Sequence, residues 1–200
     1  MPVLRRLRAA RASGHFNTSN QDLESWKQRA SDAVSLWVEY RGGWRPSRDR
    51  PLRIADFGAG NERLRGLLDT DLAIPHIYFP FDLHPQKPTT VRLDLNQQLP
   101  DDAFDLVFCL GLLEYLSSVG AFVSQISLRC RFALISFVYV GSAFPGSLAE
   151  REALGWRNHF DREELEHEFE HNGFSPVAMR TTGDGQTGLW LWAAPNGQRA

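Results

Sequence analysis

The chain has 200 residues, which is the size of a single domain. A hydrophobic share of 42% and a charged share of 23% are typical of globular proteins and exclude the collagen-like, disordered and coiled-coil classes. Lys and Arg number 22 and Asp and Glu 24, so the net charge of −2 does not favour nucleic acid as a partner.

The N-terminal part of the chain divides into an arm and a helix. Residues 1–18 are predicted to be a solvated basic arm, with a transit peptide as the alternative, because the segment is rich in Arg and has no long apolar run. Residues 19–45 are predicted to be an N-terminal cap helix, since Ser19 is a suitable N-cap and Asp22 follows three residues later. Apolar residues at helical spacing continue the pattern: Leu23, Trp26, Ala30, Ala33, Trp37 and Tyr40.

Residues 52–194 are predicted to form one α/β core. Short apolar runs predict strands at Leu52–Phe57, Ile77–Phe81, Val91–Leu93, Asp105–Leu110, Phe132–Val140, Val177–Thr181 and Leu189–Ala193. Helical spacing alternates with these runs at Glu62–Leu68, Leu112–Leu116 and Phe122–Leu128. This alternation predicts a mostly parallel seven-stranded sheet with helices on both faces, and the last two strands form an antiparallel hairpin. Pro80 cannot donate a ladder hydrogen bond, so we expect its strand to be short or bulged there.

A glycine-rich turn follows the first strand of this core. Asp56-Phe-Gly58-Ala-Gly60 precedes a helix, and Asp82 ends the next strand, where a carboxylate can accept from both hydroxyls of a ribose. Glu62 stands where the third glycine of a dinucleotide motif is expected, and acidic residues repel a pyrophosphate. The turn therefore favours a ligand that has a ribose and a positive charge, such as S-adenosyl-L-methionine, over a dinucleotide. Glu62 is either a solvated acid of the first helical turn or a contact to the ligand's amino group.

These residues resemble the class I S-adenosylmethionine-dependent methyltransferases, which have a Rossmann-like fold. The glycine turn is similar to the family's D-x-G-x-G motif, Asp94-Leu95 to its adenine-reading pair, and Phe104–Cys109 to its fourth strand. The resemblance implies the sheet order 3-2-1-4-5-7-6 and an N-terminal helix over the cofactor. It implies S-adenosyl-L-methionine as cofactor, bound by Asp56, Gly58, Gly60, Asp82, Asp94, Leu95 and Cys109. Cys109 is interpreted as a small buried side chain rather than a nucleophile.

The methyl acceptor is expected at the loops that follow the fourth and fifth strands of the sheet. In residues 141–160, His159 is the candidate general base, although it could simply support the cap of the next helix. Substrate contacts are expected from Tyr139, Trp156 and Asn158, and Tyr139 and Glu114 are secondary candidates for the base. The segment Gly155–His159 resembles methyltransferases of sugar and polysaccharide pathways, which implies a small-molecule acceptor of that kind.

Two alternative interpretations of the sequence predict other functions. His167-Glu-Phe-Glu-His171 matches a zinc-protease motif, but the apolar residues of this helix lie on its other face, so we expect no metal site. A non-catalytic methyltransferase-like binding or regulatory module is the alternative function.

Two cysteines, Cys109 and Cys130, are too few for a disulfide framework, and no apolar run approaches the roughly 18 residues of a membrane span. We therefore expect a cytoplasmic protein without a membrane partner; the sequence does not specify its oligomeric state.

Overall fold

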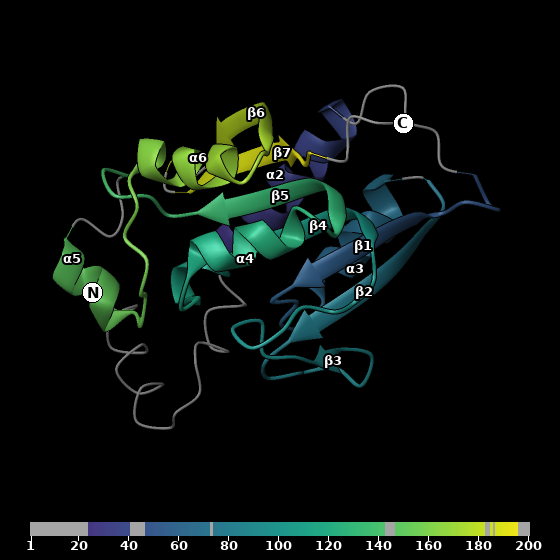
Figure 1. Ribbon diagram of the computed structural model, residues 1–200. Coiled ribbons are helices and arrows are strands. Elements are labelled where there is room, and N and C mark those ends of the chain that lie inside the picture. Colours follow the sequence, from purple (N-terminus) through teal and green to yellow (C-terminus); the bar gives the residue numbers. More distant parts are fainter. Residues whose placement is uncertain are drawn as a thin grey trace.

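The computed structural model describes residues 24–40, 47–72, 74–142, 147–182, 185 and 187–195. The predicted basic arm of residues 1–18 and the two ends of the predicted cap helix lie outside this part of the chain. The described residues form a seven-stranded sheet of order β3-β2-β1-β4-β5-β7-β6 (Figure 1). Its strands are β1 (Leu52–Phe57), β2 (His76–Asp82), β3 (Val91–Arg92), β4 (Phe104–Leu110), β5 (Cys130–Phe137), β6 (Ser175–Thr181) and β7 (Gly188–Ala193).

The strand directions confirm the expected Rossmann-like sheet. Strands β3, β2, β1, β4 and β5 pair in parallel, whereas β7 pairs antiparallel with both β5 and β6. The expectation that Pro80 shortens or bulges its strand was wrong, because β2 keeps an unbroken register with β1 and Pro80 pairs with Asp56. On its other side, β2 pairs with β3 only at Phe81 and Asp82, so Pro80 borders no second strand there. A proline is tolerated at such an edge.

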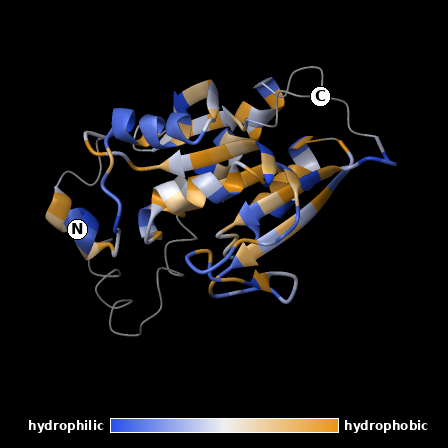
Figure 2. Cartoon of the chain, in the orientation of Figure 1, coloured by the Kyte–Doolittle hydropathy of each residue, from blue (hydrophilic) through white to orange (hydrophobic). Residues whose placement is uncertain are grey.

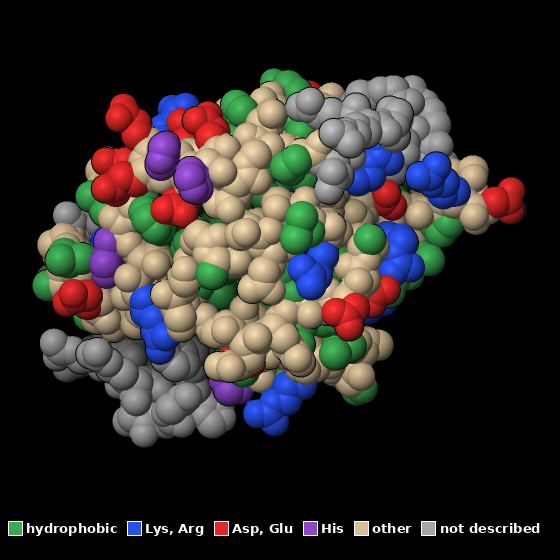
Figure 3. Space-filling model, viewed as in Figure 1, with side chains coloured by type: hydrophobic (Ala, Val, Ile, Leu, Met, Phe, Trp, Pro, Cys, Tyr) green, Lys and Arg blue, Asp and Glu red, His purple; other side chains and the backbone are tan. Residues whose placement is uncertain are grey.

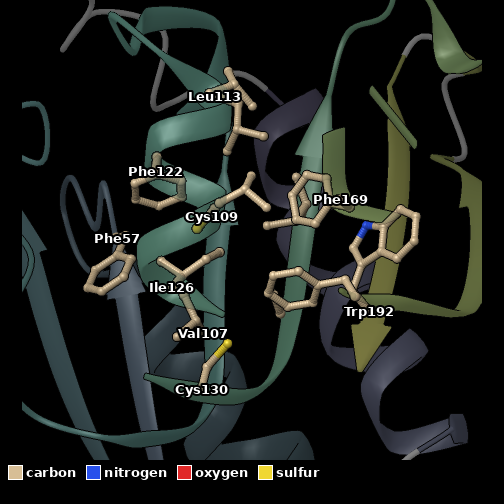
Figure 4. Packing of buried hydrophobic residues seen from close by; sticks show 14 of the residues in the cluster. Phe57, Val107, Cys109, Leu113, Phe122, Ile126, Cys130, Phe169 and Trp192 are labelled. Carbon is tan, nitrogen blue, oxygen red and sulfur yellow. The ribbon is translucent and has the colours of Figure 1, made fainter. Parts of the chain in front are cut away.

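Helices cover the two faces of the sheet. The helical segments are α2 (Glu24–Tyr40), α3 (Arg63–Leu67), η2 (Leu68–Leu72), η3 (Leu113–Tyr115), α4 (Val119–Ile126), α5 (Leu148–Ala153) and α6 (Arg162–His171). Helices α2 and α3 share one hydrophobic cluster with the sheet. Helices α4 and α6 share the other, part of which Figure 4 shows. Figure 2 shows the hydrophobic residues concentrated on β4, β5 and α4, with hydrophilic residues along α6. Within the described residues, no helix combines the length and the apolar character of a membrane span.

Two segments after the parallel strands differ from the expectation. Leu112–Leu116 is not an α-helix but a single 3-10 turn, η3. The long segment 141–160 contains the short helix α5, which begins with a capping box between Ser147 and Glu150. Such a box satisfies the first free amides of a helix, so even six residues can form one there. Both segments lie at the carboxyl ends of the parallel strands, where this type of fold binds ligands.

Candidate functional site

Two cavities lie side by side at the carboxyl ends of β1, β2 and β4. The larger has a volume of about 220 Å³ and the smaller about 60 Å³, and Trp26, Gly58 and Leu110 line both. Residues that line the larger one include Asp82, Asp94, Leu95, Tyr115 and Arg157. Residues that line the smaller one include Arg29, Asp56, Gly60 and Arg63. Six of the seven residues predicted to bind the cofactor therefore meet around one pair of cavities.

Asp82 ties the glycine turn to the end of β2. Its carboxylate accepts hydrogen bonds from the Gly60 amide, at 2.8 Å, and from the His84 amide, at 2.7 Å. Gly58 has a φ of +81°, a conformation that favours glycine. A carboxylate has about four acceptor positions, so these two amides do not exhaust the acceptor capacity of Asp82, which lines the larger cavity.

Asp94 also lines the larger cavity. Its Oδ1 accepts from the Asn96 amide at 3.0 Å and from Asn96 Nδ2 at 3.2 Å, and its carbonyl accepts from the amides of Gln97 and Gln98. Leu95 lines the same cavity and packs against the hydrophobic core. Asn96 in turn accepts a 2.7 Å hydrogen bond from the Ser117 amide, which joins this wall to the segment after β4.

Asp56 brings a buried carboxyl group to the smaller cavity. Its side chain accepts a hydrogen bond from the Tyr78 hydroxyl, and the residue is 4% exposed. Burial raises the pKa of Asp56 to about 7, although the Tyr78 hydrogen bond lowers it; the negative charges of Asp82 and Glu62 raise it further. Arg29 lines the same cavity, so one acidic and one basic residue border one small volume.

Glu62, at the third-glycine position, lines neither cavity. It has a left-handed backbone with φ 58°, is 8% exposed, and directs its carboxylate toward Thr89, Thr90 and Arg65. Burial alone would raise the pKa of Glu62, but the hydrogen bonds from the two threonines and the charge of Arg65 lower it. Glu62 is therefore neither the solvated acid nor the amino-group contact that we expected. Its carboxylate joins the turn before α3 to the segment that contains Thr89 and Thr90.

Cys109 does not reach either cavity. It is fully buried in the cluster that α4 and α6 share with the sheet (Figure 4). Burial raises the pKa of its thiol well above the ordinary value, as expected for an inert core side chain. Because Cys109 is buried away from both cavities, the prediction that it contacts the cofactor is corrected. The interpretation of Cys109 as a small buried side chain agrees with the structure.

His159, the expected base, lies outside both cavities and supports Arg151. Arg151 Nε donates to His159 Nδ1 at 3.2 Å, which leaves the imidazole proton on Nε2 and occupies the basic nitrogen. Burial and the charge of Arg151 lower the pKa of His159. The structure therefore favours a structural role for His159 over the role of general base, but its contact is Arg151 of α5 and not the cap of the next helix, which Asp161 and Glu164 form.

Of the other expected substrate contacts, Asn158 and Trp156 bind residues in or next to the η3 turn. Asn158 Nδ2 donates to the carbonyls of Leu113, at 2.6 Å, and Leu116, at 2.8 Å. Trp156 Nε1 donates to the Tyr115 hydroxyl at 3.0 Å. Tyr139 packs against Trp190 and also lines neither cavity. These three side chains are structural in this arrangement, and the prediction that they contact substrate is not supported by their positions.

Glu114 lies in the η3 turn and is 1% exposed. Its Oε1 accepts from the Val138 amide at 3.1 Å, and its carbonyl accepts from the amides of Arg157 and Asn158. Burial raises the pKa of Glu114, opposed mainly by the charge of Arg29. Glu114 therefore joins the segments after β4 and β5.

Sequence reasoning missed the side chains that α2 contributes. A Cβ atom on Gly111 would lie 2.7 Å from Arg29 Nη1 and 2.9 Å from the Trp26 ring, so both side chains rest directly on the Gly111 backbone. The pattern predicted the helix but not which residues on it face the cavities. Arg157 and Tyr115 were also not expected to line the larger cavity.

The zinc-protease motif forms no metal centre among the described residues, in which no group of three or more suitable ligands is found. His167 and His171 are exposed, whereas Leu165 and Phe169 of the same helix are fully buried. This placement confirms the expected orientation of α6. Figure 3 shows acidic and histidine side chains gathered over this helix.

No model of a protein family matches the sequence, and no curated protein matches it significantly. Solved structures do match the fold. A chain of the complex with the Haloferax volcanii Trm112 methyltransferase activator has a TM-score of 0.70 and 16% identity, covering 94% of this chain and 97% of that one. Magnesium protoporphyrin IX methyltransferase from Synechocystis PCC 6803, with bound S-adenosylmethionine, has a TM-score of 0.62 and 17% identity, covering 95% and 96%. Mitomycin 7-O-methyltransferase has a TM-score of 0.60 and 13% identity, covering 84% and 53%. The fold is therefore that of the class I methyltransferases, as the sequence motifs predicted.

Proposed function

We propose that this chain, with its class I methyltransferase fold, transfers a methyl group from S-adenosylmethionine to a small-molecule acceptor. The observation that carries the proposal is the charge pattern of the two joined cavities. Asp82 and Asp94 in the larger cavity suit the hydroxyls and the amine of an adenosine. Asp56 and Arg29 in the smaller cavity suit the ammonium and the carboxylate of an amino acid.

The donor supplies a methyl group that is already activated on a sulfonium. The residues of this chain then have to bind the donor, align it with the acceptor and exclude water, and such alignment can supply roughly 7–11 kcal/mol. Gly58 and Trp26 line both cavities, so they border the place where the adenosine and amino-acid ends of a bound donor meet. We infer that the acceptor approaches there, between α2 and the segment after β4.

The acceptor itself is proposed only as a small molecule. The similar structures named above include methyltransferases of magnesium protoporphyrin IX and of mitomycin, which differ widely in chemistry. A sugar acceptor rested on Gly155–His159, and in the structure Trp156, Asn158 and His159 of that segment bind other parts of the protein. It stays a prediction without support from the site.

Calorimetric titration with S-adenosylmethionine tests the donor, with NADH as the pyrophosphate-containing control. We expect micromolar binding of S-adenosylmethionine and none of NADH; the reverse order of affinities would overturn the proposal. An acceptor screen with radiolabelled methyl donor then separates an enzyme from the alternative, a binding module, which binds the donor without turnover. The screen needs a control for a missing partner protein, because one similar structure is a complex with a methyltransferase activator.

A further inference from the structure

Tyr78 and Asp56 form a hydrogen-bonded pair beneath the smaller cavity. Asp56 lies in β1 and Tyr78 in β2, and the tyrosine hydroxyl donates to Oδ2 of the aspartate. Asp56 lines the cavity, whereas Tyr78 does not and packs against the cluster formed by α2, α3 and the sheet. The hydroxyl therefore acts on the cavity only through the carboxyl group of Asp56.

A second set of contacts holds the Tyr78 ring in position. The guanidinium of Arg65 stacks over the ring, with its carbon 4.7 Å from the ring centroid. Arg65 Nε also donates to Glu62 at 2.8 Å, and Glu62 accepts from the hydroxyls of Thr89 and Thr90. The orientation of the ring is thus fixed by groups that do not touch the cavity. These contacts hold the Tyr78 hydroxyl where it donates a hydrogen bond to Asp56.

We propose that Tyr78 is a positioning residue for the donor: its hydroxyl favours the ionised form of the Asp56 carboxyl group and orients it to bind the ammonium of the donor's amino-acid end. The inference rests on the proposed function. It implies that affinity for S-adenosylmethionine rises with pH through neutrality, since only the ionised carboxylate attracts an ammonium group.

The groups around Asp56 determine how its pKa changes when the Tyr78 hydroxyl is removed. Burial raises the pKa of Asp56 to about 7 against the lowering effect of the Tyr78 hydrogen bond. The ionisable groups around Asp56 come from each neighbouring element: Glu62 before α3, Tyr78 and Asp82 of β2, Cys109 of β4, and Arg29 of α2 and Arg63 of α3, which line the same cavity. The Tyr78 hydrogen bond favours the Asp56 carboxylate, and the negative charges of Asp82 and Glu62 oppose it. Removal of the Tyr78 hydroxyl takes away one stabilising contact, so the ionisation must move to higher pH.

The test measures affinity for S-adenosylmethionine by calorimetry from about pH 5.5 to about pH 7, below the pKa of about 7.7–8.0 of an α-amino group. Over this interval we expect the wild-type affinity to rise about tenfold. 5′-Methylthioadenosine, which lacks the amino-acid end, is the control ligand and should bind with constant affinity. In Tyr78→Phe, which keeps the ring under Arg65, the rise should begin about one pH unit higher.

Asp56→Asn is the matched second variant, since it removes the titrating group and keeps its size. It should bind S-adenosylmethionine weakly and with no pH dependence over the same interval. A purely packing role for Tyr78 would lower affinity equally at every pH and would overturn the inference, as would a flat wild-type curve. If the wild type binds no S-adenosylmethionine at any pH, the proposed function itself fails. A flat curve with tight binding contradicts only the role of Tyr78.

Discussion

The guanidinium of Arg29 lies over the indole ring of Trp26, 4.3 Å from its centroid, and the pair rests on the backbone of Gly111. Arg29 is also held by Thr187, whose hydroxyl accepts from Nη2 at 3.3 Å. The N-terminal helix therefore reaches the site through two stacked side chains. They cover the end of β4, where the two cavities meet.

Gly111→Ala should displace the side chains of Trp26 and Arg29. The residue has a φ of +70°, and its added Cβ would lie within 3 Å of both side chains. We expect the free energy of unfolding to fall by about 1–2 kcal/mol from the backbone conformation alone. Donor affinity should fall as well, because Trp26 and Arg29 must move. Gly66→Ala is the matched control, since a Cβ there meets nothing within 4 Å.

Asp82→Asn should weaken donor binding and also loosen the glycine turn, because one of the two backbone amides that Asp82 binds loses its acceptor. The amide keeps one oxygen to accept from a backbone amide, but it loses the charge and the second acceptor oxygen. A charge-assisted hydrogen bond contributes about 1.5–3 kcal/mol, so affinity for S-adenosylmethionine should fall at least about tenfold. Unchanged affinity in calorimetry would contradict the assignment of Asp82 to the ribose.

Asn158→Ala should destabilise the protein, because the carbonyls of Leu113 and Leu116 lose their donor. Groups left unsatisfied in a partly buried site cost about 1–3 kcal/mol each, and chemical denaturation should detect the loss. Asn158→Asp is a sharper variant: a carboxylate cannot donate to either carbonyl. Wild-type stability in both variants would show that the η3 turn does not depend on residue 158.

His159→Ala separates the supporting role from catalysis. If His159 only holds Arg151, the variant should lose stability and keep turnover once an acceptor is known. Loss of turnover with normal donor affinity and normal stability would restore the general base that the sequence suggested. Differential scanning calorimetry and a methyl-transfer assay on the same preparation distinguish the two outcomes.

The buried carboxyl group of Asp56 predicts how stability of the ligand-free protein depends on pH. Its pKa rises from the ordinary 3.8 to about 7 on folding, so the folded state holds a proton that the unfolded state releases. The contribution of Asp56 to stability should therefore be greatest below the unfolded pKa and should decrease as pH rises toward about 7. Asp56→Asn should remove this decrease, which thermal unfolding at several pH values will measure. Glu62 has the opposite sign: its pKa is lowered, so its contribution is lost at acidic pH.

The strands of the sheet were predictable because they depend on local patterns, whereas the order of the strands followed from the resemblance to the methyltransferase family. Apolar runs mark the strands, and Asp82 and Asp94 follow from the positions at which two of them end. The contribution of α2 was not predictable in detail. A helical pattern shows which residues are apolar, but Trp26 and Arg29 face the cavities only because of how the helix crosses the sheet.

The segment from Gly155 to His159 shows a different limit. Its polar and aromatic residues were read as substrate contacts because long loops at this edge often carry specificity. The same side chains are equally able to satisfy backbone groups of a neighbouring turn. Asn158 and Trp156 do so on η3. Sequence alone does not distinguish an amide that binds a ligand from one that binds a carbonyl of its own chain.

The bonds between residues 156–158 and the η3 turn also have a consequence for protein engineering. The segments after β4 and β5 are joined by the carbonyl of Glu114, the Asn158 amide and the Tyr115 hydroxyl, so they behave as one exchangeable module. Grafting a new segment after β5 from another protein of this fold would remove the donors that the η3 turn needs. Such a transplant must therefore carry residues 113–117 together with residues 147–160.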